Sequence, residues 1–213
     1  MNIGGWLLQQ VSWWIPLLLS LAVHEWAHAR AAASLGDQTA ASQGRATLDP
    51  LAHIDPLGTV MLPLLGVPFG WAKPVPVNPS RFSQAISMRL GMVWVALAGP
   101  LSNLVLGLLA LGAHAVLYGH GNRLLDALSA MTAHLVMLNG LLAVFNLLPI
   151  HPLDGSRVVD GFIPDSLSGP WVAFKGAGII PLGVLLLATE LTGYSMFRPV
   201  LEWIWMAISA VQG

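Results

Sequence analysis

The sequence predicts an α-helical, multi-pass membrane protein. Of its 213 residues, 55% are hydrophobic and only 9% are charged, whereas soluble domains carry about a quarter charged residues. The apolar residues gather in runs at least as long as the ~20 residues that a helix needs to cross a bilayer. Such a chain cannot cover itself with a water-compatible surface, so we expect the lipid bilayer to surround it.

The composition also excludes several functional classes. The net charge of −1 excludes a strongly basic surface and gives no indication of nucleic-acid binding. The chain has no cysteine, which excludes disulfides, cysteine-based zinc sites and thiol nucleophiles. Nothing in the sequence indicates a preferred oligomeric state.

Four apolar runs are long enough to span a bilayer. They cover about residues 6–35, 86–118, 127–148 and 172–191. The first run carries tryptophans near its start, which is typical of a segment anchored at a membrane interface. The apolar tail at about 196–211 is either a fifth span or a helix that lies in the interface.

The segments between these runs have other predicted structures. Residues 39–48 are predicted to form short strands. Residues 57–69 are apolar, but they are too short and too rich in proline and glycine to span, which favours a re-entrant segment. The proline density of residues 70–79 excludes a helix and predicts an extended strip. Residues 156–170 are expected to form a polar connection.

A candidate metal-binding motif lies inside the first run, at His24-Glu25-Trp26-Ala27-His28. Four residues turn a helix by about 400°, so the two imidazoles lie on one face and can reach one metal ion. Glu25, one step round the helix, can reach a water on that metal. This is the H-E-x-x-H arrangement of zinc hydrolases. Ionisable groups in an apolar span are costly without a partner, and a metal ion is the partner that this spacing favours.

A catalytic zinc usually has three protein ligands and an open position for water. The residue types that could supply the third ligand are found downstream at His53, His114, His134, His151, Asp154, Asp160, Glu190 and Glu202. Asp154 stands out because it follows Pro149, where a helix in the membrane breaks. A broken backbone at membrane depth is tolerated only where it lines a cavity or packs on protein. The alternative interpretation of Asp154 is a turn residue before Gly155.

The basic residues predict the orientation of the chain in the membrane. If residues 57–69 only dip into the bilayer, residues 36–85 and the region around 156–175 lie on the same side. Seven of the nine Lys and Arg residues then lie on that side: Arg30, Arg45, Lys73, Arg81, Arg89, Arg157 and Lys175. The positive-inside rule makes this side cytoplasmic. We therefore expect a cell-membrane protein whose active site lies toward the cytoplasm.

Two distant motifs together resemble those of the site-2 protease family of intramembrane zinc metalloproteases. They are His24-Glu25-x-x-His28 and Asn146-x-x-Pro149-x-x-Pro152-Leu153-Asp154-Gly155. The stretch from Ala98 to Asn103 and the strip at 70–79 look like the compact bacterial branch of that family, whose members lack PDZ and CBS domains.

The resemblance implies roles for five residues. Those matching His24, His28 and Asp154 bind one zinc ion per chain, and the one matching Glu25 is the catalytic acid and base. The residue matching Asn146 helps to hold substrate or stabilises the transition state.

The resemblance also implies a fold. We expect a single domain over residues 1–213, with a three-helix catalytic core at about 6–160 that includes re-entrant and extended segments. One or two C-terminal helices at about 170–211 follow the core.

The expected function is hydrolysis of peptide bonds within or near transmembrane segments of membrane-protein substrates, as in regulated intramembrane proteolysis. An unwound transmembrane protein or peptide could pair with the extended segments at 39–48 or 71–77 by β-addition. One alternative is a membrane H-E-x-x-H protease of the CAAX or stress type, which takes a downstream glutamate as third ligand. The other is a metal-binding membrane scaffold without proteolytic activity.

Overall fold

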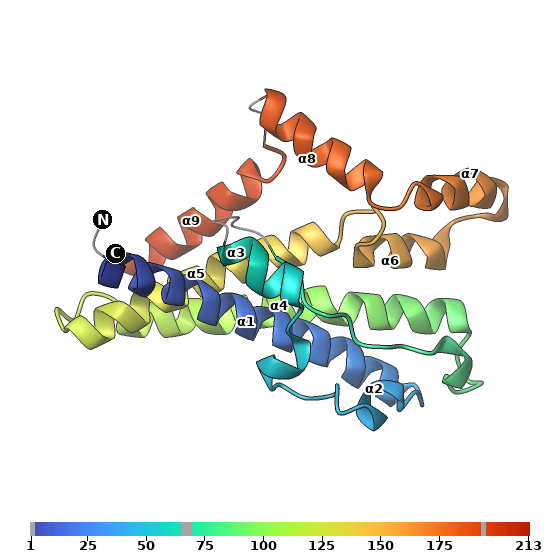
Figure 1. The fold of residues 1–213 in the computed structure, drawn as a ribbon, viewed down its shortest axis with the longest axis horizontal. Coiled ribbons are helices and arrows are strands. Elements are labelled where there is room, and N and C mark those ends of the chain that lie inside the picture. Colours follow the sequence, from blue (N-terminus) through green and yellow to red (C-terminus); the bar gives the residue numbers. More distant parts are fainter. Residues whose placement is uncertain (1–2, 65–69, 193–194) are drawn as a thin grey trace.

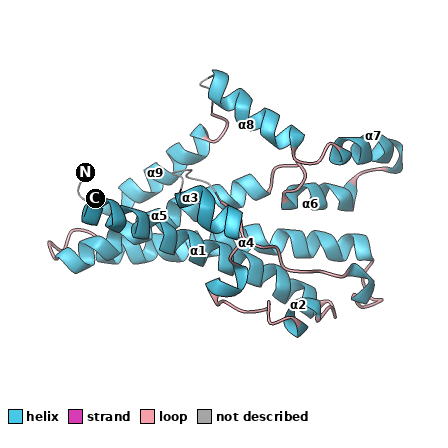
Figure 2. Cartoon of the chain, viewed as in Figure 1, coloured by secondary structure: helices cyan, strands magenta, loops and turns pink. Residues whose placement is uncertain are grey.

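A computed structural model describes residues 3–64, 70–192 and 195–213 of the protein. This part of the chain is helical, and no strand occurs in it (Figure 2). Its α-helices are α1 (Ile3–Ser34), α2 (Thr39–Ser42), α3 (Leu62–Leu64), α4 (Met88–Leu117), α5 (Arg123–Asn146), α6 (Asp154–Phe162), α7 (Asp165–Gly176), α8 (Ile180–Thr192) and α9 (Arg198–Gln212). Shorter helical turns are η1 (Pro50–His53), η2 (Pro56–Met61) and η3 (Pro79–Arg81).

Three long helices form the centre of the fold. α1, α4 and α5 pack against one another, while α8 and α9 form an arch beside them (Figure 1). Of the described helices, α4 and α5 are each long and apolar enough to cross a membrane. A glycine lets α5 and α9 approach closely, since a Cβ at Gly140 of α5 would lie 2.6 Å from Ile204 Cδ1 in α9.

The structure differs from the sequence predictions in three segments. Residues 39–48 form the short helix α2 and turns instead of strands. The Asp37 carboxylate accepts a hydrogen bond from the N–H of Thr39, the first residue of α2, which favours a turn over an extended chain there. Residues 172–191 do not form one straight span. The chain turns by 73° between α7 and the next helix, at a break that includes Gly178 with φ 63°.

The polar connection predicted at 156–170 is also largely helical, since α6 and the start of α7 occupy it. In the predicted re-entrant segment, η2 and α3 cover residues 56–64, and residues 65–69 lie outside the described part of the chain. Residues 70–79 (the strip) have no regular secondary structure before η3 begins at Pro79, as their prolines predict.

The strip is tied to the rest of the fold by hydrogen bonds from its main chain. Near its start, the Lys73 N–H donates to the His53 carbonyl at 2.9 Å, and the Arg45 guanidinium donates to the Lys73 carbonyl at 2.6 Å. Near its end, the Asn78 N–H donates to the Asp37 carboxylate at 2.6 Å. The strip is therefore held against the end of α1 that is predicted to face the cytoplasm.

A second set of contacts holds α6. The Arg89 guanidinium, at the start of α4, donates to the carbonyls of Asp160 and Ile163 at the end of α6. The Asp160 carboxylate accepts from Lys175 at 2.5 Å and from the Trp171 indole at 2.7 Å, both in α7. These bonds fix α6 between α4 and α7, and so fix the position of its first residue, Asp154.

Asp37 is the buried acidic group at the end of α1. Burial alone would raise the pKa of its carboxyl group. The Asn78 N–H, the Thr39 hydroxyl and the Thr39 N–H donate to the carboxylate and outweigh burial, so the pKa lies below its ordinary value. The ionised form of Asp37 is therefore the form that stabilises the strip.

We expect Asp37→Asn to lower the free energy of unfolding at neutral pH by about 1–3 kcal/mol, since buried donors lose a charged acceptor. A carboxyl group with a lowered folded-state pKa stabilises fully above its unfolded pKa of about 3.9 and loses this effect as the pH falls through the folded value. Chemical unfolding in detergent at pH 7 and at acidic pH measures the difference. The exposed Asp49, changed to Asn, is the control. A deficit in Asp37→Asn that stays constant into acid would contradict this role.

Candidate metal centre

His24 and His28 lie on the same face of α1 and are both buried. Their Nε2 atoms are 3.0 Å apart. Asp154, the first residue of α6, places its Oδ2 atom 3.2 Å from each of these nitrogens. The three side chains thus bring their ligand atoms to one point, where they could hold a metal ion.

The hydrogen-bond partner of each Nδ1 atom shows that this nitrogen carries a proton. His28 Nδ1 lies 2.7 Å from the Val95 carbonyl oxygen, and His24 Nδ1 lies 2.6 Å from Asn103 Oδ1. Both oxygens only accept, so each Nδ1 carries the proton and donates it. In the neutral form of each ring, the Nε2 lone pair then points toward Asp154.

The orientation of the Asn103 amide follows from the hydrogen bonds around it. Asn103 Nδ2 donates to Asn139 Oδ1 at 2.7 Å and to the Ser20 carbonyl at 3.2 Å. Asn139 is itself oriented, because its Nδ2 donates to the Leu135 carbonyl at 2.8 Å. This buried network joins α1, α4 and α5, and it leaves Asn103 Oδ1 as the acceptor for His24.

These assignments make the cluster suited to a cation. With both rings neutral, two nitrogen lone pairs and a carboxylate oxygen face one another at 3.0–3.2 Å. Asp154 Oδ2 is buried, and apart from the two imidazoles it has no hydrogen-bond partner among the described residues, which is costly for a carboxylate. A divalent cation satisfies all three atoms, and two imidazoles with one carboxylate form a ligand set that zinc accepts.

Gly99 of α4 provides the space for the two rings. A Cβ at this position would lie 2.4 Å from His28 Nε2 and 2.6 Å from His24 Cε1. Both distances are shorter than side chains tolerate, so any larger residue would displace the imidazoles. Gly99 and Asn103 are four residues apart and thus lie on the same face of α4.

Glu25 is buried beside the cluster and is oriented by the strip. Its Oε2 atom accepts a hydrogen bond from the Val75 N–H at 2.7 Å. Val75 stands between Pro74 and Pro76, which have no N–H, so it is the one main-chain donor at this place in the strip. Its hydrogen bond leaves the second carboxylate oxygen of Glu25 without a partner among the described residues.

A cavity of about 320 Å³ opens onto these groups. His24, Glu25, His28 and Asp154 line it, together with residues of the strip and Leu182 of α8. Asn146, the last residue of α5, also lines it, and its Nδ2 donates to the Leu142 carbonyl at 2.9 Å. The cavity therefore contains every residue that the sequence assigned to the site.

The other candidate ligands from the sequence have partners elsewhere or lie on the surface. His53, His114 and His134 each contact a backbone carbonyl, Asp160 pairs with Lys175, Glu202 pairs with Arg198, and His151 is exposed. The side chain of Glu190 lies outside the described part of the chain. Within that part, His24, His28 and Asp154 alone form a group of this kind.

The chain is similar to "Putative zinc metalloprotease YwhC" of Bacillus subtilis, with 37% identity over 187 residues that cover 86% of this chain and 83% of the relative. The chain belongs to the site-2 protease family. This site-2 protease is also 31% identical to "Putative zinc metalloprotease Rip2" of Mycobacterium tuberculosis, over 96% of its own length and 72% of the relative. No family model and no solved structure matches the chain.

Sequence reasoning missed three groups around the centre of this site-2 protease. Gly99 and Asn103 have no role among the residues that the sequence assigned to the site, whereas both lie against the histidines. The Val75 N–H belongs to the main chain, so the residue type does not predict its hydrogen bond to Glu25. The spacing of Gly99 and Asn103 was the available signal, because it puts a space and an acceptor on one face of α4.

We expect Gly99→Ala to lower zinc affinity at least tenfold, since displaced ligands typically cost a metal site one to two orders of magnitude. Competition with a fluorescent zinc chelator measures this affinity. Gly112→Ala in the same helix is the matched control, because a Cβ at Gly112 meets no atom within 4 Å. Equal zinc affinity in the two variants would show that the space at Gly99 does not serve the metal centre.

Proposed function

We propose that this site-2 protease is an intramembrane zinc endopeptidase, which hydrolyses peptide bonds within or near transmembrane segments of membrane-protein substrates. The observation that carries the proposal is the convergence of His24, His28 and Asp154 on one point, with Glu25 in the same cavity. Similarity to relatives that are named as zinc metalloproteases supports the same chemistry.

His24 Nε2, His28 Nε2 and Asp154 Oδ2 would hold one zinc ion per chain. Three protein ligands leave a fourth position for water or substrate, which is the pattern of catalytic zinc sites. The bound zinc supplies a Lewis acid that polarises a carbonyl group and lowers the pKa of a bound water to about 7. The hydrogen bonds from both Nδ1 atoms orient the imidazoles so that each Nε2 points toward the metal position.

Glu25 is proposed as the general base and acid. The Val75 N–H holds one of its oxygens, and the other can accept the proton of the attacking water. Glu25 then delivers this proton to the nitrogen of the leaving amine. The Asn146 amide has a second N–H that can donate to the oxyanion or to the substrate backbone.

The substrate is proposed to be a transmembrane helix that unwinds locally, because an intact helix hides its carbonyl groups in hydrogen bonds. The strip supports this proposal as a partner for the unwound chain. The Val77 N–H makes no hydrogen bond within the described residues and is available for β-addition. Pairing at residues 39–48 is not proposed, because this segment is not extended.

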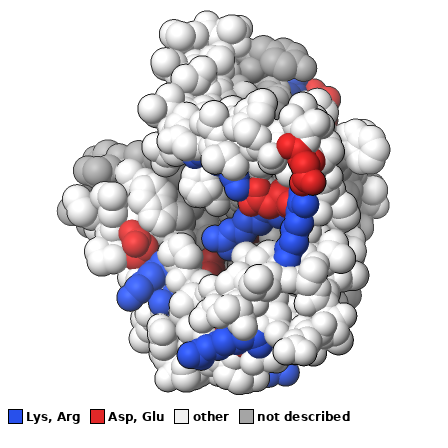
Figure 3. Space-filling view, turned by 90° about the vertical axis from the view of Figure 1, so that its right-hand side faces the viewer, with Lys and Arg blue, Asp and Glu red and all other residues white. Residues whose placement is uncertain are grey.

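We propose a multi-pass protein of the cell membrane whose site lies toward the cytoplasm, with residues 1–213 as one domain. The lengths and apolar character of α4 and α5 support the bilayer location. Figure 3 views the end of the molecule that holds α6, α7 and the start of α4, where basic and acidic side chains lie in and around a hollow. Basic residues at this end support a cytoplasmic orientation.

The alternative functions receive less support. A protease of the CAAX or stress type takes a downstream glutamate as third ligand, but Glu202 is exposed and pairs with Arg198 at 3.0 Å. Asp154 already fills that position. A scaffold without proteolytic activity has no need of a carboxylate such as Glu25, buried and oriented beside the metal centre.

We expect Glu25→Gln to reduce cleavage at least a hundredfold, because general acid–base catalysis typically contributes two to four orders of magnitude. Zinc content should remain at one ion per chain, since Glu25 is not a ligand. Co-expression with a panel of single-span membrane proteins, followed by detection of fragments, measures cleavage. The control is Glu202→Gln, which removes an exposed glutamate far from the cavity and should cleave normally. Fragments that appear equally with Glu25→Gln and the unaltered protein would refute the protease proposal.

A further inference from the structure

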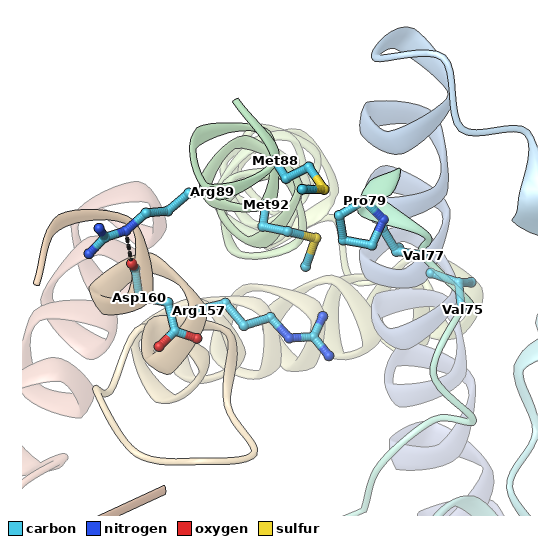
Figure 4. Close-up of a pocket in the computed structure, with 8 residues that line it drawn as sticks. All are labelled: Val75, Val77, Pro79, Met88, Arg89, Met92, Arg157 and Asp160. Atoms are coloured by element: carbon cyan, nitrogen blue, oxygen red, sulfur yellow. Dashed lines mark hydrogen bonds between the residues drawn. The ribbon is translucent and has the colours of Figure 1, made fainter. Parts of the chain in front are cut away.

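A second cavity, of about 410 Å³, adjoins the cavity of the metal centre. It is lined by Val75, Val77 and Pro79 of the strip, by Met88, Arg89 and Met92 of α4, and by Arg157 and Asp160 of α6 (Figure 4). Val75, Val77 and Arg157 line both cavities. A peptide that leaves the metal centre along the strip therefore passes Arg157.

Arg157 is the one basic side chain of this second cavity that is free among the described residues. Arg89 is engaged with the carbonyls of Asp160 and Ile163. The Asp160 carboxylate is engaged with Lys175 and forms no ion pair with Arg157. Figure 4 shows the Arg157 side chain extending from α6 across the cavity toward the strip. Its guanidinium thus lies in the path of the peptide without a counter-ion.

The charges of the two cavities favour an anionic ligand at this point. Glu25 and Asp154 together balance the charge of one zinc ion, and the Asp160 carboxylate is paired with Lys175, so none of the carboxylates that line the two cavities neutralises Arg157. A guanidinium binds a carboxylate through two parallel hydrogen bonds. Arg157 is exposed, and the neighbouring Val77, Met88 and Met92 side chains offer apolar contacts to a peptide that binds beside it.

The helix geometry indicates where that carboxylate belongs in the substrate. Arg157 follows Asp154 by three residues, which places it on the same face of α6 and roughly 4.5 Å further along the axis. The arginine side chain adds several ångströms of reach. An extended peptide advances about 3.3 Å per residue, so the guanidinium lies about two to three residues from the scissile bond.

We propose that Arg157 is a specificity-determining residue, which binds an acidic side chain of the substrate two or three residues from the cleaved bond. This inference rests on the proposed proteolytic function and adds to it the substrate feature that the second cavity recognises. The apolar walls and their continuity with the strip favour a peptide carboxylate over a lipid phosphate as the occupant.

The test uses a single-span substrate from the panel, with Asp, Asn or Lys placed in turn at each of the three positions on either side of the cleaved bond. Cleavage is measured in phosphatidylcholine vesicles for the unaltered protein, Arg157→Gln, Arg157→Lys and Arg157→Glu. The matched control is Arg30→Gln. This variant removes an exposed positive charge from α1, two residues after His28, and Arg30 lines neither cavity. Zinc content of every variant confirms that the metal centre is intact.

We expect Asp at one of these positions to raise kcat/KM roughly tenfold over Asn, the size of effect that one charge-assisted hydrogen-bonded pair gives. Arg157→Gln should abolish the preference, Arg157→Lys should keep part of it, and Arg157→Glu should favour the substrate with Lys. Arg30→Gln should retain the full preference.

Three results overturn the assignment. An unchanged preference in Arg157→Gln shows that another group reads the substrate. A preference that appears only when phosphatidylglycerol is added to the vesicles assigns Arg157 to a lipid headgroup. Cleavage that persists in Glu25→Gln refutes the proteolytic function itself, and this outcome is distinct because it does not depend on Arg157.

Discussion

The convergence of two imidazole lone pairs and one carboxylate oxygen on a single buried point is the constraint on which the rest of the structure depends. A cation between His24, His28 and Asp154 satisfies all three ligand atoms, which would otherwise be costly to bury together in an apolar interior. Each surrounding feature keeps the three ligand atoms pointed inward. Asn103 and Val95 accept from the outer nitrogens, and Gly99 leaves the space for the rings.

The same constraint explains why the chain breaks after α5. Asp154 must reach the histidines from a different segment, and a continuous helix would carry it past them. The turn that follows α5 is tight, since a Cβ at Gly155 would lie 2.2 Å from the Leu147 carbonyl oxygen. Ser156 Oγ closes the start of α6 by donating to the Leu153 carbonyl at 2.7 Å. Arg89 then holds the far end of α6 against α4.

Local features of the sequence predict those parts of the site that depend on one segment at a time. The four-residue spacing of His24 and His28 and the break at Pro149 are of this kind, and so are the long apolar runs of α4 and α5. The orientation of the Asn103 amide depends on three helices at once. The bond from Val75 to Glu25 depends on the path of the main chain. Neither is visible in residue types.

The errors in the predicted fold have a related cause. Residues 39–48 lack a clear periodicity, and the Asp37 carboxylate holds their start in a turn by accepting from the Thr39 N–H and from the Asn78 N–H of the strip. The run at 172–191 is apolar enough for a span, but its composition does not show that the chain turns at Gly178. Hydrophobicity predicts whether a segment prefers the bilayer to water, but the backbone conformation decides whether the segment forms one straight helix.

X-ray absorption at the zinc edge of the purified, zinc-loaded protein tests the central claim most directly, because it counts the ligands by type. The account predicts one zinc ion per chain with two imidazole nitrogens and oxygen ligands, at distances of about 2.0–2.2 Å. Three or more imidazoles in the spectrum, or a protein that retains no zinc, would contradict a centre built from His24, His28 and Asp154.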